Sequence, residues 1–181
     1  MKTEKIFFLD FEASSLNWES YPIEVAWGNE LSNIESYLIS PESIKSWKDW
    51  NPESEKIHNI SRLKLIQSGI NPSKVCETMT KNLSNCIVYT DNPDWDSLWI
   101  RRLFISCNID LPPIDIRHID SLLIETVCPN LFDRINGLFN ILQLKVKAKK
   151  MGKGPHRAGQ DVEYLINLYK LAKNRTKRFT I

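Results

Sequence analysis

The segment KIFFLDFEASSL, residues 5–16, combines a strongly apolar run with two carboxylates. Residues 5–13 have the composition of a β-strand, in which side chains alternate between two faces. One face then carries Phe7, Leu9 and Phe11, and the other carries Ile6, Phe8, Asp10 and Glu12. Because both faces begin apolar, we expect the strand to be covered on both sides. The two acids would then lie beside a core, where like charges are costly unless a cation neutralises them. A solvated strand end is the alternative.

The length of 181 residues predicts one domain spanning 1–181, with a basic C-terminal tail from about 174 to 181. Hydrophobic residues at 42% and charged residues at 25% are typical of globular proteins. No window approaches the ~18–20 apolar residues of a membrane span. The apolar run before Asp10 is shorter than the ~7–15 residues of a signal peptide. We therefore expect a cytoplasmic protein without a membrane partner, whose cysteines are reduced thiols.

The net charge of +2 is unevenly distributed along the chain. Residues 145–181 hold eleven Lys and Arg against two Asp and Glu, so the rest of the chain is acidic. This asymmetry indicates a site that handles both cations and a polyanion. Residues 145–155 are predicted to form a basic loop, whereas the final KNRTKRFTI would also fit a frayed tail.

The pattern of apolar residues and turn signals predicts an α/β domain. Residues 22–28 and 34–40 are predicted strands joined by a short turn, so the domain opens with a three-stranded antiparallel meander. The polar stretch 41–61 is predicted to form loops and short turns. The remaining predicted elements are a helix at 71–83, a short buried strand at 85–91, a helix from Pro93, a strand passing into a helix at 115–128, and helices at 131–144 and about 158–173.

Two of the predicted helices also direct a carboxylate toward the core. Asp96 lies in the first turn of the helix from Pro93 and shares a face with Ile100, Leu103 and Cys107. Asp161 shares a face with Leu165, Leu168 and Ala172. Four inward acids without matching buried bases would repel one another, and oxygen-loving Mg²⁺ or Mn²⁺ would resolve this. His156, just before the last helix, is a candidate general base, whereas His58 and His118 are expected at the surface.

Three segments, LDFEASSL, NPDWD and HRAGQD, resemble in sequence and order the three motifs of the DEDD superfamily of exonucleases. These motifs are Asp-x-Glu, Asn-x-x-(aromatic)-Asp and His-x-Ala-x-x-Asp. The histidine form resembles the DEDDh branch, which includes proofreading exonucleases, ribonuclease T and oligoribonuclease. The likeness spans residues 6–173. The segment around His58 also resembles the family's His-Gly-Ile stretch, with Asn59 in place of the glycine, and Asn tolerates the left-handed conformation.

The resemblance implies a ribonuclease-H-like fold, a five-stranded mixed sheet flanked by helices, and 3′→5′ release of nucleoside monophosphates. It also implies two divalent cations, Mg²⁺ or Mn²⁺. Asp10, Glu12 and Asp161 would bind the first ion, Asp10 would bridge to the second, and Asp96 would hold the water shell of that second ion. In the same scheme His156 takes a proton from the attacking water.

The expected partner is single-stranded nucleic acid or a 3′ overhang, either DNA or RNA. The residues predicted to contact substrate are Ser14, Ser15, Leu16, Trp18, Asn92, Lys147, Lys149, Lys150 and Lys153. The lysines would follow the phosphates, and Leu16 and Trp18 would stack on terminal bases, although a packing role suits Trp18 equally. The alternatives are a phosphodiesterase acting on very short oligonucleotides or nucleotides and a non-catalytic nucleic-acid-binding module of the same fold. A homodimer is left open.

Overall fold

The computed structural model describes residues 5–128, 134–150 and 156–176 of the chain. Its elements, in chain order, are β1 (Ile6–Ala13), β2 (Pro22–Gly28), β3 (Ile34–Leu38), α1 (Pro52–His58), α2 (Arg62–Ser68), α3 (Pro72–Leu83), β4 (Ile87–Thr90), α4 (Pro93–Ser106), β5 (Asp115–His118), α5 (Ile119–Val127), α6 (Arg134–Lys150) and α7 (Ala158–Thr176).

The five strands form one mixed sheet in the order β3-β2-β1-β4-β5. β1, β2 and β3 pair antiparallel, whereas β4 and β5 run parallel to β1. The prediction of a five-stranded mixed sheet that opens with an antiparallel meander is confirmed. β1 lies in the centre of this sheet. Because β4 runs parallel beside it, the C-terminal ends of β1 and β4 lie at the same end of the sheet.

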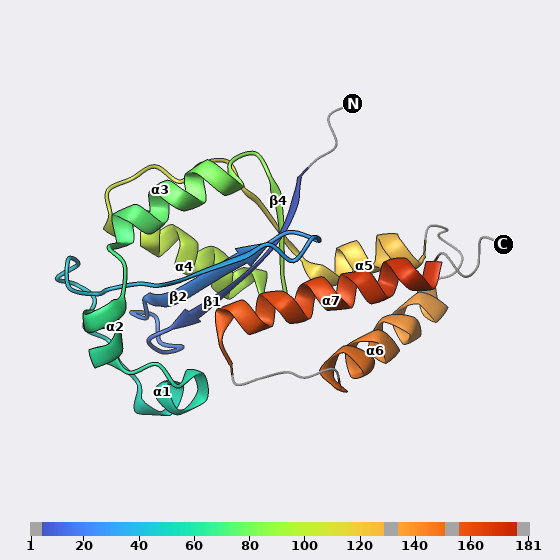
Figure 1. Cartoon of the computed structure of the whole chain (residues 1–181), viewed down its shortest axis with the longest axis horizontal. Coiled ribbons are helices and arrows are strands. Elements are labelled where there is room, and N and C mark those ends of the chain that lie inside the picture. The colour runs from blue at the N-terminus through green and yellow to red at the C-terminus, as the bar shows by residue number, and fades with distance from the viewer. Residues whose placement is uncertain (1–4, 129–133, 151–155, 177–181) are drawn as a thin grey trace.

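Helices cover both faces of the sheet (Figure 1). Leu9 and Phe11 belong to one core, together with apolar residues of α3 and α4. Phe8 belongs to a second core on the opposite face, formed with α5, α6 and α7. The predicted alternation of β1 between two buried faces is therefore confirmed. It also determines that Asp10 and Glu12, which share the face of Phe8, point to the side of α7.

An Asn-Pro pair begins three of the helices. Pro72 opens α3, and the Asn71 side chain caps the helix by accepting a hydrogen bond of 2.9 Å from the Ser73 N–H. Asn92 and Pro93 likewise begin α4, but the Asn92 side chain makes no capping hydrogen bond. The Asn92 N–H instead donates to the Thr90 hydroxyl at 3.1 Å.

The third Asn-Pro pair corrects the prediction that 41–61 forms only loops and turns. Asn51 caps the seven-residue helix α1 by accepting from the Glu53 N–H at 2.8 Å. Asn59 ends α1 in the left-handed conformation, with φ 55°, as its substitution for glycine predicted. The helix escapes sequence analysis because its residues are polar and show no apolar periodicity.

Two boundaries near the C-terminus also differ from the prediction. Residues 145–150 are not loop but the last turns of α6, and α7 continues to Thr176, into the expected tail. The rest of that tail and the predicted helical residues 131–133 lie outside the described residues. Within the described ranges, no helix is long and apolar enough to cross a membrane.

Candidate active site

Three of the predicted acids converge where β1 ends. One carboxylate oxygen from each of Asp10, Glu12 and Asp161 lies within 4.8 Å of the other two. Asp10 and Glu12 come from β1, and Asp161 comes from the first turn of α7, which packs against β1. Asp10 and Asp161 are buried, while Glu12 is half-buried. The sheet and the helix thus bring together carboxylates that are far apart in sequence.

The electrostatics of Asp10 fit a cation site. Its pKa is raised well above the usual value, mainly by burial and then by the charges of Asp96, Asp161 and Glu12. Its Oδ2 atom is buried and has no hydrogen-bond partner among the described residues. Hard divalent cations prefer carboxylate oxygens and would remove this repulsion. The residues present therefore fit a hard divalent cation, which Asp10, Glu12 and Asp161 would hold.

Asp96 lies beside this cluster rather than inside it. It is buried in the first turn of α4, where it accepts hydrogen bonds from the Thr90 hydroxyl and the Phe11 backbone N–H. Burial raises the pKa of Asp96 to about 8 despite these hydrogen bonds. Its carboxylate is not part of the group of three acids within 4.8 Å, but its charge contributes to the raised pKa of Asp10. This position is compatible with an outer ligand.

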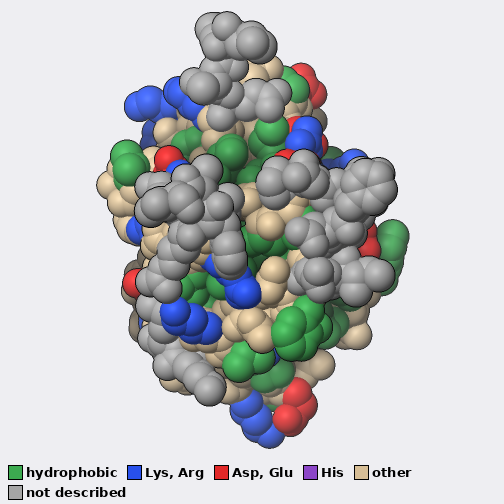
Figure 2. Space-filling model, turned by 90° about the vertical axis from the view of Figure 1, so that its right-hand side faces the viewer, with side chains coloured by type: hydrophobic (Ala, Val, Ile, Leu, Met, Phe, Trp, Pro, Cys, Tyr) green, Lys and Arg blue, Asp and Glu red, His purple; other side chains and the backbone are tan. Residues whose placement is uncertain are grey.

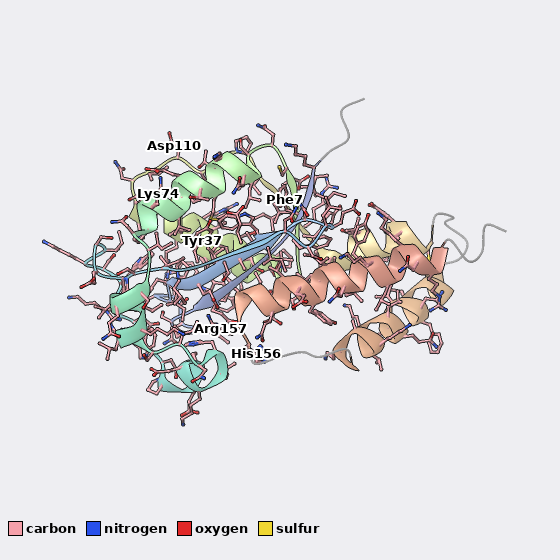
Figure 3. All side chains as sticks on the ribbon, viewed as in Figure 1. Phe7, Tyr37, Lys74, Asp110, His156 and Arg157 are labelled. Atoms are coloured by element: carbon pink, nitrogen blue, oxygen red, sulfur yellow. The ribbon has the colours of Figure 1, made fainter. Side chains whose placement is uncertain are left out.

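His156 lies directly before α7 and above the acids. Its Nδ1 is 4.0 Å from the Asp161 Oδ2, which is beyond hydrogen-bonding distance. The side chain is 55% exposed, so the ring is free to approach a bound molecule. Figure 3 shows His156 and Arg157 together at the beginning of α7. A histidine near the cluster but outside its centre is the arrangement expected of a base that is not itself a ligand.

The loop between β1 and β2 contains four of the predicted substrate residues, of which two are exposed and two are buried. Leu16 and Trp18 are 66% and 78% exposed and are available for stacking. Ser14 and Ser15 are instead buried, and their hydroxyls donate to the Asp49 carboxylate at 3.1 and 2.5 Å. Sequence analysis missed Asp49. Its role is to hold this loop against residues 41–51, which places the two apolar side chains outward.

The described basic residues of 145–150 lie on α6, beside the last turns of α7. Lys147 and Lys149 are exposed, and Lys147 lines a cavity of about 360 Å³ with Leu171 and Arg175 from the last turns of α7. At 1.5 Å per residue, these turns lie roughly 15–20 Å from that of Asp161. Figure 2 shows Lys and Arg side chains among hydrophobic ones on the side of the molecule that lies on the right in Figure 1. The Lys150 side chain and Lys153 lie outside the described residues.

His58 corrects the prediction of a surface histidine, whereas His118 is partly exposed as expected. His58 is only 2% exposed, and its Nδ1 accepts a hydrogen bond of 3.0 Å from the Ile60 N–H. Burial lowers the pKa of His58, although the charges of Glu55 and Glu24 act in the opposite direction. Because Nδ1 accepts, the proton of the neutral ring resides on Nε2.

A buried ion pair that sequence analysis missed joins β2 to the start of α7. The Arg157 Nη2 lies 2.6 Å from a carboxylate oxygen of Glu24, which is 2% exposed. The pair lies beside His156 and one turn before Asp161. The segment PIEVAWG predicted the strand that contains Glu24, but no local signal connects Glu24 to a partner so distant in sequence.

Comparison with known proteins identifies the fold. No protein-family model matches the sequence, and no curated protein is significantly similar to it. Solved structures of exonuclease I are similar: the Escherichia coli enzyme with a dT13 oligonucleotide has a TM-score of 0.69 and 17% identity, covering 97% of this chain and 42% of that chain. Its zinc-bound complex with single-stranded DNA has a TM-score of 0.65 and 16% identity, covering 98% and 42%.

A moderately thermophilic exonuclease I from Methylocaldum szegediense has a TM-score of 0.65 and 14% identity, covering 97% of this chain and 42% of that chain. The chain therefore spans about two fifths of the length of these proteins. At such low identity the likeness shows the fold. The expected ribonuclease-H-like arrangement is confirmed.

Proposed function

We propose that this chain is a DEDDh-type, metal-dependent 3′→5′ exonuclease that releases nucleoside monophosphates from single-stranded nucleic acid. The observation that carries the proposal is the convergence of Asp10, Glu12 and Asp161 within 4.8 Å. Asp96 beside the cluster and His156 above it complete the five residues of the motif. The intact set favours an enzyme over a non-catalytic binding module, which needs no such cluster of acids.

Each residue has a defined task in this proposal. Asp10, Glu12 and Asp161 would hold two divalent cations, which would supply positive charge to stabilise the attacking and leaving oxygens of the phosphodiester. Thr90 keeps Asp96 oriented from outside the cluster. His156 accepts the proton of the attacking water.

Single-stranded DNA is the first substrate to test, because the similar E. coli structures contain single-stranded oligonucleotides. The exposed Leu16 and Trp18 offer a stacking surface that accepts any base, since every base has an apolar face. Nothing among the described residues forms a recognisable reader of the 2′-hydroxyl. The choice between DNA and RNA is therefore part of the experiment.

The decisive experiment is digestion of 5′-labelled single-stranded DNA, double-stranded DNA, RNA and dinucleotides in Mg²⁺ or Mn²⁺. We expect a ladder that shortens from the 3′ end, disappears in EDTA and returns when metal is restored. Asp10→Asn, which keeps the shape of the side chain, serves as the inactive control. Full activity in EDTA would contradict the proposal. Cleavage of dinucleotides alone would indicate the phosphodiesterase alternative, and binding without cleavage would indicate a binding module.

A further inference from the structure

The carboxylate of Glu24 is fully engaged by hydrogen bonds although it is buried. Its Oε2 accepts from the Arg157 Nε at 2.9 Å and from the Ala158 N–H at 3.1 Å. Its Oε1 accepts from the Arg157 Nη2 at 2.6 Å and from the Ser36 hydroxyl at 3.2 Å. This bidentate arrangement is the strong and directional form of the arginine–carboxylate pair. Three of the four donors belong to the first residues around the start of α7.

Strand register places Glu24 directly beside the acid cluster. Glu24 on β2 is the cross-strand partner of Glu12 on β1, so both side chains emerge on the same face of the sheet. Two like charges in directly opposite positions repel each other. The positive charge of the Arg157 guanidinium offsets this repulsion. The pKa of Arg157 reflects these interactions, since it is raised first by the hydrogen bonds to Glu24 and also by the charges of Glu24 and Glu12.

The backbone at Arg157 determines where two site residues lie. The Arg157 carbonyl accepts from the Gln160 N–H at 2.9 Å and from the Asp161 N–H at 3.0 Å, so it starts the turn that carries Asp161. His156 immediately precedes Arg157, and its side chain is more than half exposed. Its position therefore depends on the backbone that Glu24 anchors through Arg157 and Ala158.

We propose that Glu24 is a positioning residue, which acts through Arg157 to fix His156 and Asp161 over the acids of β1. This inference rests on the proposed nuclease function of the same site. Glu24 itself does not touch the reacting atoms, because both its oxygens are occupied by the four donors. Its role is to anchor the first turn of α7 to β2.

Glu24→Gln tests this role, because the variant keeps the side-chain shape and removes the charge. We expect a single-turnover rate at saturating metal and substrate that is about 10–100-fold lower, with little change in substrate affinity, as for a small misplacement of reacting groups. The matched control is Glu30→Gln. Glu30 pairs with Lys173 at 2.6 Å and ties the opposite end of α7 to the turn after β2, remote from the acids. Loss of this exposed ion pair should change the single-turnover rate by less than about two-fold.

A second readout does not depend on turnover. Mn²⁺ broadens NMR signals of nearby nuclei, so the His156 ring signals should broaden in the native protein and broaden less in Glu24→Gln. If the native protein binds Mn²⁺ but cleaves nothing, the proposed function fails, while this comparison still tests the positioning. If Glu24→Gln does not fold, Arg157→Lys decides, because it keeps the charge and loses the bidentate geometry; it should show an intermediate loss in both readouts. Rates and broadening equal to those of Glu30→Gln would overturn the inference.

Discussion

The buried carboxyl of Asp96 predicts that the metal-free protein loses stability as the pH rises. Burial raises the pKa of Asp96 from 3.8 to about 8. Between these two values the folded state retains a proton that the unfolded state has released, so the free energy of unfolding falls with rising pH. One pH unit is worth about 1.4 kcal/mol, so the full loss is about 6 kcal/mol.

Replacing Asp96 by Asn removes this titration. At pH 7 the titration of Asp96 has lowered the free energy of unfolding of the native protein by about 4 kcal/mol. The variant does not titrate there, but its new amide group faces a hydrogen-bond donor, which costs about 1 kcal/mol of stability. We therefore expect metal-free Asp96→Asn to be about 3 kcal/mol more stable at pH 7, which raises Tm by about 6–12 °C for a chain of this length. Near pH 4 the advantage should vanish.

Urea denaturation in EDTA at a series of pH values measures this difference. The control is Asp94→Asn, an exposed acid in the same first turn of α4, which should change stability by less than about 0.5 kcal/mol throughout. The reasoning is refuted if the difference between Asp96→Asn and the native protein does not grow from acid to neutral pH.

Three further outcomes are expected. His156→Ala should retain metal binding and slow single-turnover cleavage by about 10²–10⁴-fold, whereas Asp161→Ala should weaken metal binding in calorimetry; equal metal loss in both would exclude the base role. Neutralising Lys147 and Lys149 together should reduce the salt dependence of single-strand binding by roughly 0.7 in slope per lost phosphate contact; an unchanged slope would place these lysines off the strand's path. Burial lowers the pKa of His58 in the folded protein. The neutral ring therefore stabilises the fold at pH values above the pKa of His58 in the unfolded chain, and this stabilisation is lost as the pH falls. His58→Asn keeps an acceptor, so its stability deficit in urea titrations should narrow from pH 7 to pH 5; a constant deficit would contradict this.

The sheet and the acids were predictable because each depends on a short, regular pattern. Alternation along β1 separates Leu9 from Asp10, and two different cores receive the two faces. Helical spacing from Leu165 back to Asp161 predicts the inward direction of that acid, which is buried. Such patterns report directly which side of an element meets the core.

The residues that sequence analysis missed depend on contacts between distant segments. His58 and Glu24 are polar residues within ordinary local patterns, and both are buried. Glu24 is satisfied by Arg157, which lies directly before α7 and is 133 residues away in sequence. Asp49 likewise acquires its role only when the loop after β1 folds back on it. Burial of a polar group follows from its partners, and local periodicity does not identify them.

The central position of β1 has a consequence for biosynthesis. β1 is translated before α7, yet Asp161 of its acid cluster lies on α7, the last helix described. A domain whose key pairings are so distant in sequence completes its fold only after its late segments are available. A nascent chain that ends before residue 156 therefore has neither the third acid nor His156. If the proposed nuclease activity is correct, the growing polypeptide stays inactive toward neighbouring nucleic acid until translation has passed α7.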